Sequence, residues 1–420
     1  MTSENNGLPW DKSKDTTPYR SNAFGKIRFF AGESVDPSTV MPGASARFLR
    51  LAGETDDKYL KGVYDLLIGK DLFNLPKPDL LIEITGAAKE FVHVDKRVID
   101  RFNSNLIEAA NSTNAWLVTG GTHAGIMKTV GEAVTKYRLA NQSRSLTCLG
   151  ITAWGVVNRR EELVSENGIW PDQIGDKGHY EVEDHFVTKD YPSLDPGHNC
   201  FLLVDNTQEK RFYQAGPFRT SFLKYVAENA RRGSPGCDTK IPLVLLVVGG
   251  GPGTLDVVHM SILGSDNTKG STNHEDDGGE EEDDEGEEGK KERKHVKRSP
   301  AIIFPGFGGF ADVLAFAFQI TEGKEDKDER LFHQYSGGIQ IERVVESVVP
   351  KDFDERIRKH PEFARLFQKR GYKTSSHKKE LSEAEKRDEQ IKEEKKEKKA
   401  LEIIEKIKAI LQHRNCVRKK

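Results

Sequence analysis

The 420-residue sequence has few cysteines, little net charge and no long apolar run. Its four cysteines are Cys148, Cys200, Cys237 and Cys416. They show no C-x-x-C spacing, which argues against a zinc site or a disulfide framework and fits a reducing compartment. The 64 basic and 67 acidic residues give a formal net charge of −3, which argues against nucleic acid as a partner. Residues 243–248, the longest apolar run, are too few to span a bilayer, and the N-terminus lacks the apolar core of a signal peptide. We therefore expect a soluble chain that is not itself inserted in a membrane.

Two common phosphate-binding motifs are also missing, namely the G-x-G-x-x-G dinucleotide fingerprint and the G-x-x-x-x-G-K-[ST] P-loop. The sequence instead repeats a pattern in which an apolar strand ends in a turn of small residues. The five predicted strands are 78–84, 115–118, 149–151, 241–248 and 301–304, followed by turns at 85–88, 119–123, 152–155, 249–254 and 305–309. Parallel strands end at one edge of a sheet, which is where ligands bind in open α/β folds. The pattern predicts a Rossmann-like open parallel sheet with helices on both faces.

The turn at 119–123 illustrates the expected chemistry. A helix is predicted at 124–137, with Thr122 as its N-cap. Free backbone N–H groups and the helix dipole would then attract an anion above the sheet. A tight turn that binds nothing is the alternative for any single turn of this kind. Further helices are predicted at 58–67 and 96–111.

Composition divides the chain into four parts. Residues 1–25 are a polar tail, and residues 26–320 form the Rossmann-like domain. An acidic run at 266–299 is a disordered, solvated insertion within that domain, because like charges at such density cannot build a core. Residues 321–420 are helical and highly charged, and are expected to begin a helical repeat region. Their final amphipathic stripe either folds back on the domain or awaits further helices: Leu401, Ile404, Ile407 and Leu411.

Two stretches offer candidate ligands without a regular motif. Residues 158–199 lose periodicity and contain His179, His185 and His198, which we interpret as loop histidines rather than metal ligands because their spacing is irregular. Residues 211–220 place an aromatic pair before Arg219 near the start of a predicted helix. This arrangement would suit an adenine stacked on the aromatic ring and a phosphate held by Arg219, or equally a packed aromatic and a solvated arginine.

Taken in order over roughly residues 26–318, the motifs resemble the N-terminal cytoplasmic melastatin homology region of transient receptor potential channels. The G-G-P-G-T-L form at 250–255 most resembles the member gated by ADP-ribose and calcium. The resemblance implies a SLOG-type nucleotide-sensing fold at the cytoplasmic face of a tetrameric, calcium-permeable channel. It implies binding of ADP-ribose or a related adenine nucleotide, with no cofactor. The remaining channel polypeptide and neighbouring subunits are the implied partners.

The resemblance also implies a set of ligand-binding residues. The family uses a tyrosine and an arginine seven residues later, at the positions of Phe212 and Arg219. Its asparagine in the first turn falls on Glu90, and its second arginine on Gly309. With the small-residue turns, the candidate ligand-binding residues are Thr85, Gly86, Gly120, Gly121, Thr122, His123, Trp154, Phe212, Arg219, Gly250, Gly251, Gly253, Thr254, Gly306, Phe307 and Gly308.

Two other function classes remain open. Related LOG and lysine-decarboxylase-like enzymes hydrolyse nucleotides with P-G-G-x-G-T-x-x-E, but the glutamate position here is Val257, which cannot act as an acid. The neighbouring Asp256 is expected to point elsewhere, so we expect no enzyme activity and no catalytic residue. The third class is a structural module for channel assembly with a vestigial pocket.

Overall fold

The computed structural model describes residues 24–40, 44–70, 73–141, 146–163, 180–183, 191–205, 215–233, 238–263, 299–321, 352–367, 383–413 and 417–419. Its strands form one sheet in the order β10-β9-β8-β3-β4-β5-β7-β2-β1-β6. All neighbouring pairs are parallel except β1 and β2. The predicted α/β class and open, mainly parallel sheet are therefore confirmed. The strands are β1 Phe24–Ala31, β2 Ser45–Ala52, β3 Leu80–Gly86, β4 Ala115–Thr119, β5 Thr147–Ala153, β6 Tyr180–Val182, β7 Cys200–Asp205, β8 Leu243–Val248, β9 Ala301–Phe304 and β10 Val417–Lys419.

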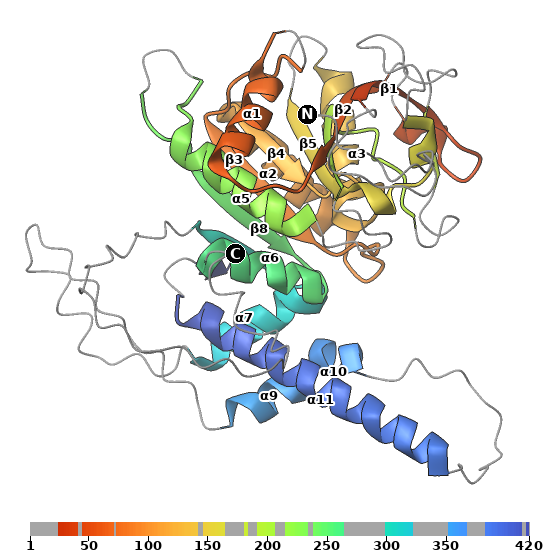
Figure 1. Cartoon of the computed structure of the whole chain (residues 1–420), viewed down its shortest axis with the longest axis vertical. Coiled ribbons are helices and arrows are strands. Elements are labelled where there is room, and N and C mark those ends of the chain that lie inside the picture. The colour runs from red at the N-terminus through yellow and green to blue at the C-terminus, as the bar shows by residue number, and fades with distance from the viewer. Residues whose placement is uncertain are drawn as a thin grey trace, which may run out of the picture.

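Helices cover both faces of the sheet (Figure 1). On one face α1 and α5 share a hydrophobic cluster with β3, β4, β5 and β7, and α6 packs beside them. On the other face α2 and α3 pack on β3, β4 and β8. The α-helices are α1 Asp57–Ile68, α2 Lys96–Ser112, α3 Gly125–Ala140, α5 Ala215–Asn229, α6 Pro252–Leu263, α7 Gly309–Thr321, α9 Phe353–Lys359, α10 Pro361–Phe367 and α11 Glu383–Leu411, and the 3-10 turns are η1 Pro37–Thr39, η2 Trp154–Val156 and η3 Arg160–Leu163.

Local sequence accounts for the helices beside the central strands. The Asp56 side chain accepts a hydrogen bond from the Tyr59 N–H and caps α1, and Asp95 caps α2 by accepting from the Arg97 N–H. In α2 the apolar residues lie on the face that meets the sheet, including Phe102 and Leu106, while the opposite face is polar. The helices predicted at 58–67 and 96–111 are confirmed with small shifts at their ends.

The strand order creates a switch point between β3 and β8. From β3 the chain proceeds through β4, β5 and β7 in one direction, and β8 then returns to the other side of β3. In an open α/β sheet, ligands bind outside the carboxyl ends of the two strands at such a point. The turns that follow β3, β8 and β9 are neighbours there, which brings three of the five predicted small-residue turns together.

The structure adds β1 and β2, which the sequence did not predict, and two further short strands. β6 lies within the stretch expected to be irregular and pairs with β1, and β10 pairs with β9 at the far edge. Each has only three residues, too few to show a periodic pattern.

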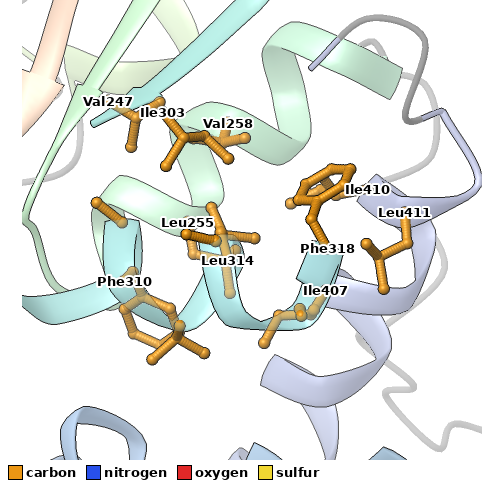
Figure 2. Packing of buried hydrophobic residues seen from close by; sticks show 14 of the residues in the cluster. Val247, Leu255, Val258, Ile303, Phe310, Leu314, Phe318, Ile407, Ile410 and Leu411 are labelled. Carbon is orange, nitrogen blue, oxygen red and sulfur yellow. The ribbon is translucent and has the colours of Figure 1, made fainter. Parts of the chain in front are cut away.

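The predicted C-terminal amphipathic stripe folds back on the α/β unit. Helix α11 packs against α6 and α7, and its Ile407, Ile410 and Leu411 contribute to the same apolar cluster as Leu255 and Phe318 (Figure 2). One predicted member of the stripe is wrong, because Leu401 is 45% exposed. Ala400 and Ile403 are buried instead, so the buried stripe is shifted around the helix.

Several sequence predictions lie outside the described residues. They include nearly all of the polar tail, the acidic insertion up to residue 298, His179, His185 and Phe212. The proposed boundary near residue 320 stays a prediction. In the described segments, no helix combines the length and the apolar character needed to cross a membrane.

Candidate functional site

The candidate site is the carboxyl edge of the sheet at the switch point. The turn after β3 approaches β8 closely, since a Cβ on Gly86 would lie 2.0 Å from the carbonyl oxygen of Val248. The Ala87 N–H donates to that same oxygen at 3.0 Å. Thr254, in the first turn of α6, donates from Oγ1 to the Gly86 carbonyl at 3.2 Å. Hydrogen bonds therefore join the turn after β3 to the end of β8 and to Thr254 at this edge. Thr85 and Gly253 lie beside Gly86 and Thr254, and a ligand-binding role for these residues stays a prediction.

The turns after β8 and β9 are joined through backbone hydrogen bonds. Gly250 has a φ of +106° and accepts at its carbonyl oxygen from the N–H of Phe310 at 3.0 Å. Gly249 accepts from Ala311 at 3.1 Å in the same way. The first N–H groups of α7 are thus used inside the fold. This close approach of two backbones explains why small residues occupy both turns.

The turn after β9 already binds carboxylates. The N–H groups of Gly306 and Gly308 donate to the two carboxylate oxygens of Asp312, at 2.6 and 3.1 Å. The Gly309 N–H donates at 3.0 Å to Oε2 of Glu362, which comes from α10. The turn has the expected affinity for negative charge, but its N–H groups are not open donors, and the chain itself supplies the anions.

Phe307 has a packing role within this turn. Its ring meets Phe91 edge-on at a centroid distance of 5.2 Å and Phe102 at 5.9 Å. These contacts fix the loop after β3 against the turn after β9. Edge-to-face aromatic pairs of this kind add to the apolar burial.

Arg219 lies on α5, at the position predicted for a phosphate clamp. It is only 8% exposed, and its Nε donates to Oε1 of Glu83 at 2.9 Å. Glu83 lies in β3 and is 1% exposed. Burial raises the pKa of Glu83, and the positive charges of Arg219 and Lys224 oppose that shift. Arg219 is therefore neither solvated nor unpaired, and a ligand phosphate would share it with a buried carboxylate.

The turn after β4 differs from its prediction. Thr122 is not the N-cap of α3, because the helix begins after Ala124, for which the described residues give no side-chain cap. Thr122 instead pairs with Leu194 in an isolated antiparallel bridge, and the His123 N–H donates to the Ser193 carbonyl at 2.7 Å. Residues 193–195 thus pair with backbone groups of the turn that were predicted to be free to bind an anion.

Gly120 and Gly121 complete this turn. A Cβ on Gly121 would lie 2.7 Å from the Cα of Gly150 in β5, so the glycine permits the close approach of two strands. The Gly121 N–H donates to Oγ1 of Thr119, and its carbonyl oxygen accepts from the Asp195 N–H. A Cβ on Gly120 would make only ordinary contacts with Met127.

A buried polar network lies beneath this turn, which sequence reasoning missed. Asp195 accepts from His123 Nδ1 at 2.8 Å and contacts His198 Nδ1 at 3.0 Å, and His198 Nε2 lies 2.7 Å from Oγ1 of Thr119. Burial alone would lower the pKa of His198, but its interactions with Cys148 and Asp195 outweigh burial and raise it to about 10. His198 is thus a structural residue, and the described residues contain no cluster of metal ligands. The only local sign of this network in the sequence is the turn at residues 195–197, which begins with Asp195.

Trp154 is buried rather than presented to a ligand. Its ring packs under the guanidinium of Arg50, whose Cζ lies 4.8 Å from the ring centroid. Arg50 also forms a buried ion pair with Asp205 at the end of β7. The contacts among these three side chains join the carboxyl ends of β2, β5 and β7.

The positions that depart from the family pattern have other partners. Glu90 pairs with Lys128 at 2.9 Å, and its side chain is 43% exposed. Gly309 has a φ of +63°, and a Cβ there would lie 2.1 Å from the carbonyl oxygen of Gly250. An arginine at this position would therefore require the two turns to separate.

The enzyme-like positions also lack the expected chemistry. Val257 is buried in the apolar cluster with α11. Asp256 accepts from Lys406 of α11 at 2.8 Å, so it points away from the carboxyl edge, as expected. Neither side chain can serve as an acid at the switch point.

Comparison with known proteins identifies similar sequences over part of the chain. Residues 46–268 match the family model described as SLOG in TRPM. The chain is 31% identical over 258 residues to transient receptor potential cation channel subfamily M member 2 of Rattus norvegicus, covering 61% of this chain and 16% of the relative. It is 30% identical over 323 residues to the subfamily M member-like 2 protein of Nematostella vectensis, covering 74% and 17%. Member 4 of Rattus norvegicus is 31% identical over 242 residues, covering 57% and 18%. The chain spans less than a fifth of the length of these relatives.

Proposed function

This chain belongs to the family of SLOG domains found in TRPM channels, and on that premise we propose that it is the nucleotide-sensing part of a calcium-permeable cation channel. It lies at the cytoplasmic face and binds ADP-ribose or a related adenine nucleotide at the carboxyl edge of its sheet. Binding regulates gating through contacts with the remaining channel polypeptide and with neighbouring subunits. The ligand, the partners and the location are parts of this proposal.

The observation that carries the proposal is the place of Arg219. Its place near the start of α5 brings the guanidinium of Arg219 to Glu83 in β3, one of the two strands at the switch point. The hydrogen bond to Glu83 uses Nε, and the described residues give no hydrogen-bond partner to the two Nη groups. Guanidinium Nη groups donate well to phosphate oxygens. Arg219 can therefore hold Glu83 and a phosphate together.

Substitution of Arg219 tests this function. Arg219→Ala should weaken ADP-ribose binding by about 1.5–3 kcal/mol, the usual worth of charge-assisted hydrogen bonds. Isothermal titration calorimetry on the 420-residue chain measures the change. Arg231→Ala is the matched control, because Arg231 follows the far end of α5 and is 48% exposed. It should keep the affinity of the unchanged chain.

Loss of Arg219 also leaves Glu83 buried without its direct partner, which is destabilising by itself. The double variant Arg219→Ala/Glu83→Gln removes both charges and separates binding from stability. If the unchanged chain, the single variant and the double variant bind ADP-ribose with the same affinity, Arg219 does not contact the ligand. A ligand found at the opposite edge of the sheet would show that the carboxyl edge is not the binding site.

A structural role in channel assembly is the second candidate function. It is favoured by the carboxylates of Asp312 and Glu362, which already bind the N–H groups of the turn after β9. A chain that binds no ADP-ribose in the calorimetric experiment would support this function. Assaying the same solution for released adenine tests hydrolysis of the N-glycosidic bond, which the positions of Val257 and Asp256 do not favour.

A further inference from the structure

Glu83 is a charged residue in the middle of a buried strand. It lies between Leu81 and Thr85 on the face of β3 that α5 covers. Its partners in register on β4 and β8 are Val118 and Leu245, which are apolar. The neighbouring strands therefore offer no charge at this register to offset the carboxylate, and compensation comes from α5.

The ion pair with Arg219 satisfies only one side of the carboxylate. Oε1 accepts from Arg219 Nε, whereas Oε2 is buried without a hydrogen-bond partner in the described parts of the chain. Lys224, five residues further along α5, acts on Glu83 through its charge, and its Nζ donates to the carbonyl oxygen of Met260 at 2.8 Å. These two are the charged groups of the described residues that face Glu83. Arg219 is its direct partner.

The protonation of a buried carboxylate with one direct partner depends on whether that partner also binds another anion. A phosphate that accepts hydrogen bonds from the Nη groups of Arg219 draws on the same positive charge and adds negative charge beside Glu83. The ionised carboxylate then becomes costly in its apolar surroundings, whereas the protonated form does not. We propose that Glu83 takes up a proton when a nucleotide phosphate binds Arg219, so that ligand binding at this edge depends on pH. This inference rests on the proposed function.

The sign of the effect follows from the groups around Glu83. Burial already raises the Glu83 pKa, while Arg219 and Lys224 oppose the rise. A bound phosphate weakens that opposition, so the pKa of Glu83 is higher in the complex than in the free chain. Affinity therefore increases as the pH falls through the pKa of the complex, by at most about tenfold per pH unit, and levels off below the pKa of the free chain.

Calorimetry in buffers of different ionisation enthalpy measures this proton directly. ADP-ribose is a suitable probe because its diphosphate is a diester that does not titrate near neutral pH. Binding to the 420-residue chain is measured between about pH 6 and 8 in buffers that contain no phosphate. We expect the observed heat to vary with the buffer and to show uptake of up to about one proton.

Two variants assign the proton. Glu83→Gln keeps the shape of the side chain but cannot take up a proton, so the dependence on buffer and on pH should disappear. Glu108→Gln is the matched control, because Glu108 is an exposed carboxylate near the C-terminal end of α2, away from the carboxyl edge. It should keep the proton uptake of the unchanged chain.

The outcomes separate the two proposals. Binding by the unchanged chain without proton uptake overturns the role of Glu83 and leaves the proposed function standing. Proton uptake that persists in Glu83→Gln also overturns it, because another group then takes the proton. Absence of binding to both the unchanged chain and Glu83→Gln overturns the proposed function and this inference with it. If Glu83→Gln does not fold, Glu83→Leu, an apolar side chain of similar size that cannot take up a proton, replaces it in the same buffer and pH series.

Discussion

Gly309 shows how one backbone position limits the chemistry of the carboxyl edge. Its positive φ and the nearby Gly250 carbonyl leave no room for a side chain. The position where the family resemblance places a second arginine is therefore closed to any side chain in this fold. The negative charge of Glu362 at the Gly309 N–H is a consequence of the same geometry.

This geometry predicts different costs at two glycines of one turn. Gly306 has a φ of +88°, but a Cβ added there would meet open space, so Gly306→Ala should lose about 1–2 kcal/mol of unfolding free energy from the left-handed backbone alone. Gly309→Ala adds a clash with Gly250 and should lose about 2–5 kcal/mol. Urea unfolding compares them. Equal losses would show that the turns after β8 and β9 are further apart than the structure indicates.

Sequence identifies the residues that a turn needs, but not their distant partners. The glycines at 249–250 and 306–309 are recognisable because a tight turn after a strand is a local feature. Glu83 and Arg219 are 136 positions apart, and no local pattern connects a strand carboxylate to a helix arginine at that separation. Thr122 fails for the same reason, because hydrogen bonds from residues 193–195 override a local capping preference.

Among the elements, α11 gives the clearest contrast between its two sides. Ile407 is fully buried against α6 and α7, whereas Leu401 on the same helix is exposed. Ile407→Ala should lower the unfolding free energy by about 2–5 kcal/mol, because it removes buried methyl groups and leaves a cavity. Leu401→Ala is the control and should change it by less than about 0.5 kcal/mol. Chemical denaturation of both variants tests whether α11 is part of the core.

The elements that can be predicted are those with enough residues to show a pattern. Central strands such as β4 and β8 are continuous apolar runs because both faces of the sheet are covered. The limits of the buried side of α11 are harder to predict, because Ile403 is buried whereas the nearby Leu401 is exposed. Which apolar residues at the margin of the stripe are covered depends on α6 and α7, which the helix sequence does not encode.

At the scale of the molecule, the acidic insertion separates α6 from β9. The structure describes α6 up to Leu263 and β9 from Ala301, with the insertion between them. Deleting residues 266–298 would leave a connection of ordinary length for an α/β unit. We expect a small change in melting temperature, because loop closure depends weakly on length. A large decrease in differential scanning calorimetry would show that the insertion packs on the domain.

The folding back of α11 has a consequence for the order in which the chain is made. The apolar sides of α6 and α7 are covered by a helix that the ribosome adds about 100 residues later (Figure 2). At typical rates of translation this delay lasts roughly 5–20 s. During that interval the incomplete domain exposes the apolar surface of α6 and α7, and the edge of β9 lacks its partner strand. We therefore expect the nascent polypeptide to be prone to aggregation until α11 and β10 emerge from the ribosome.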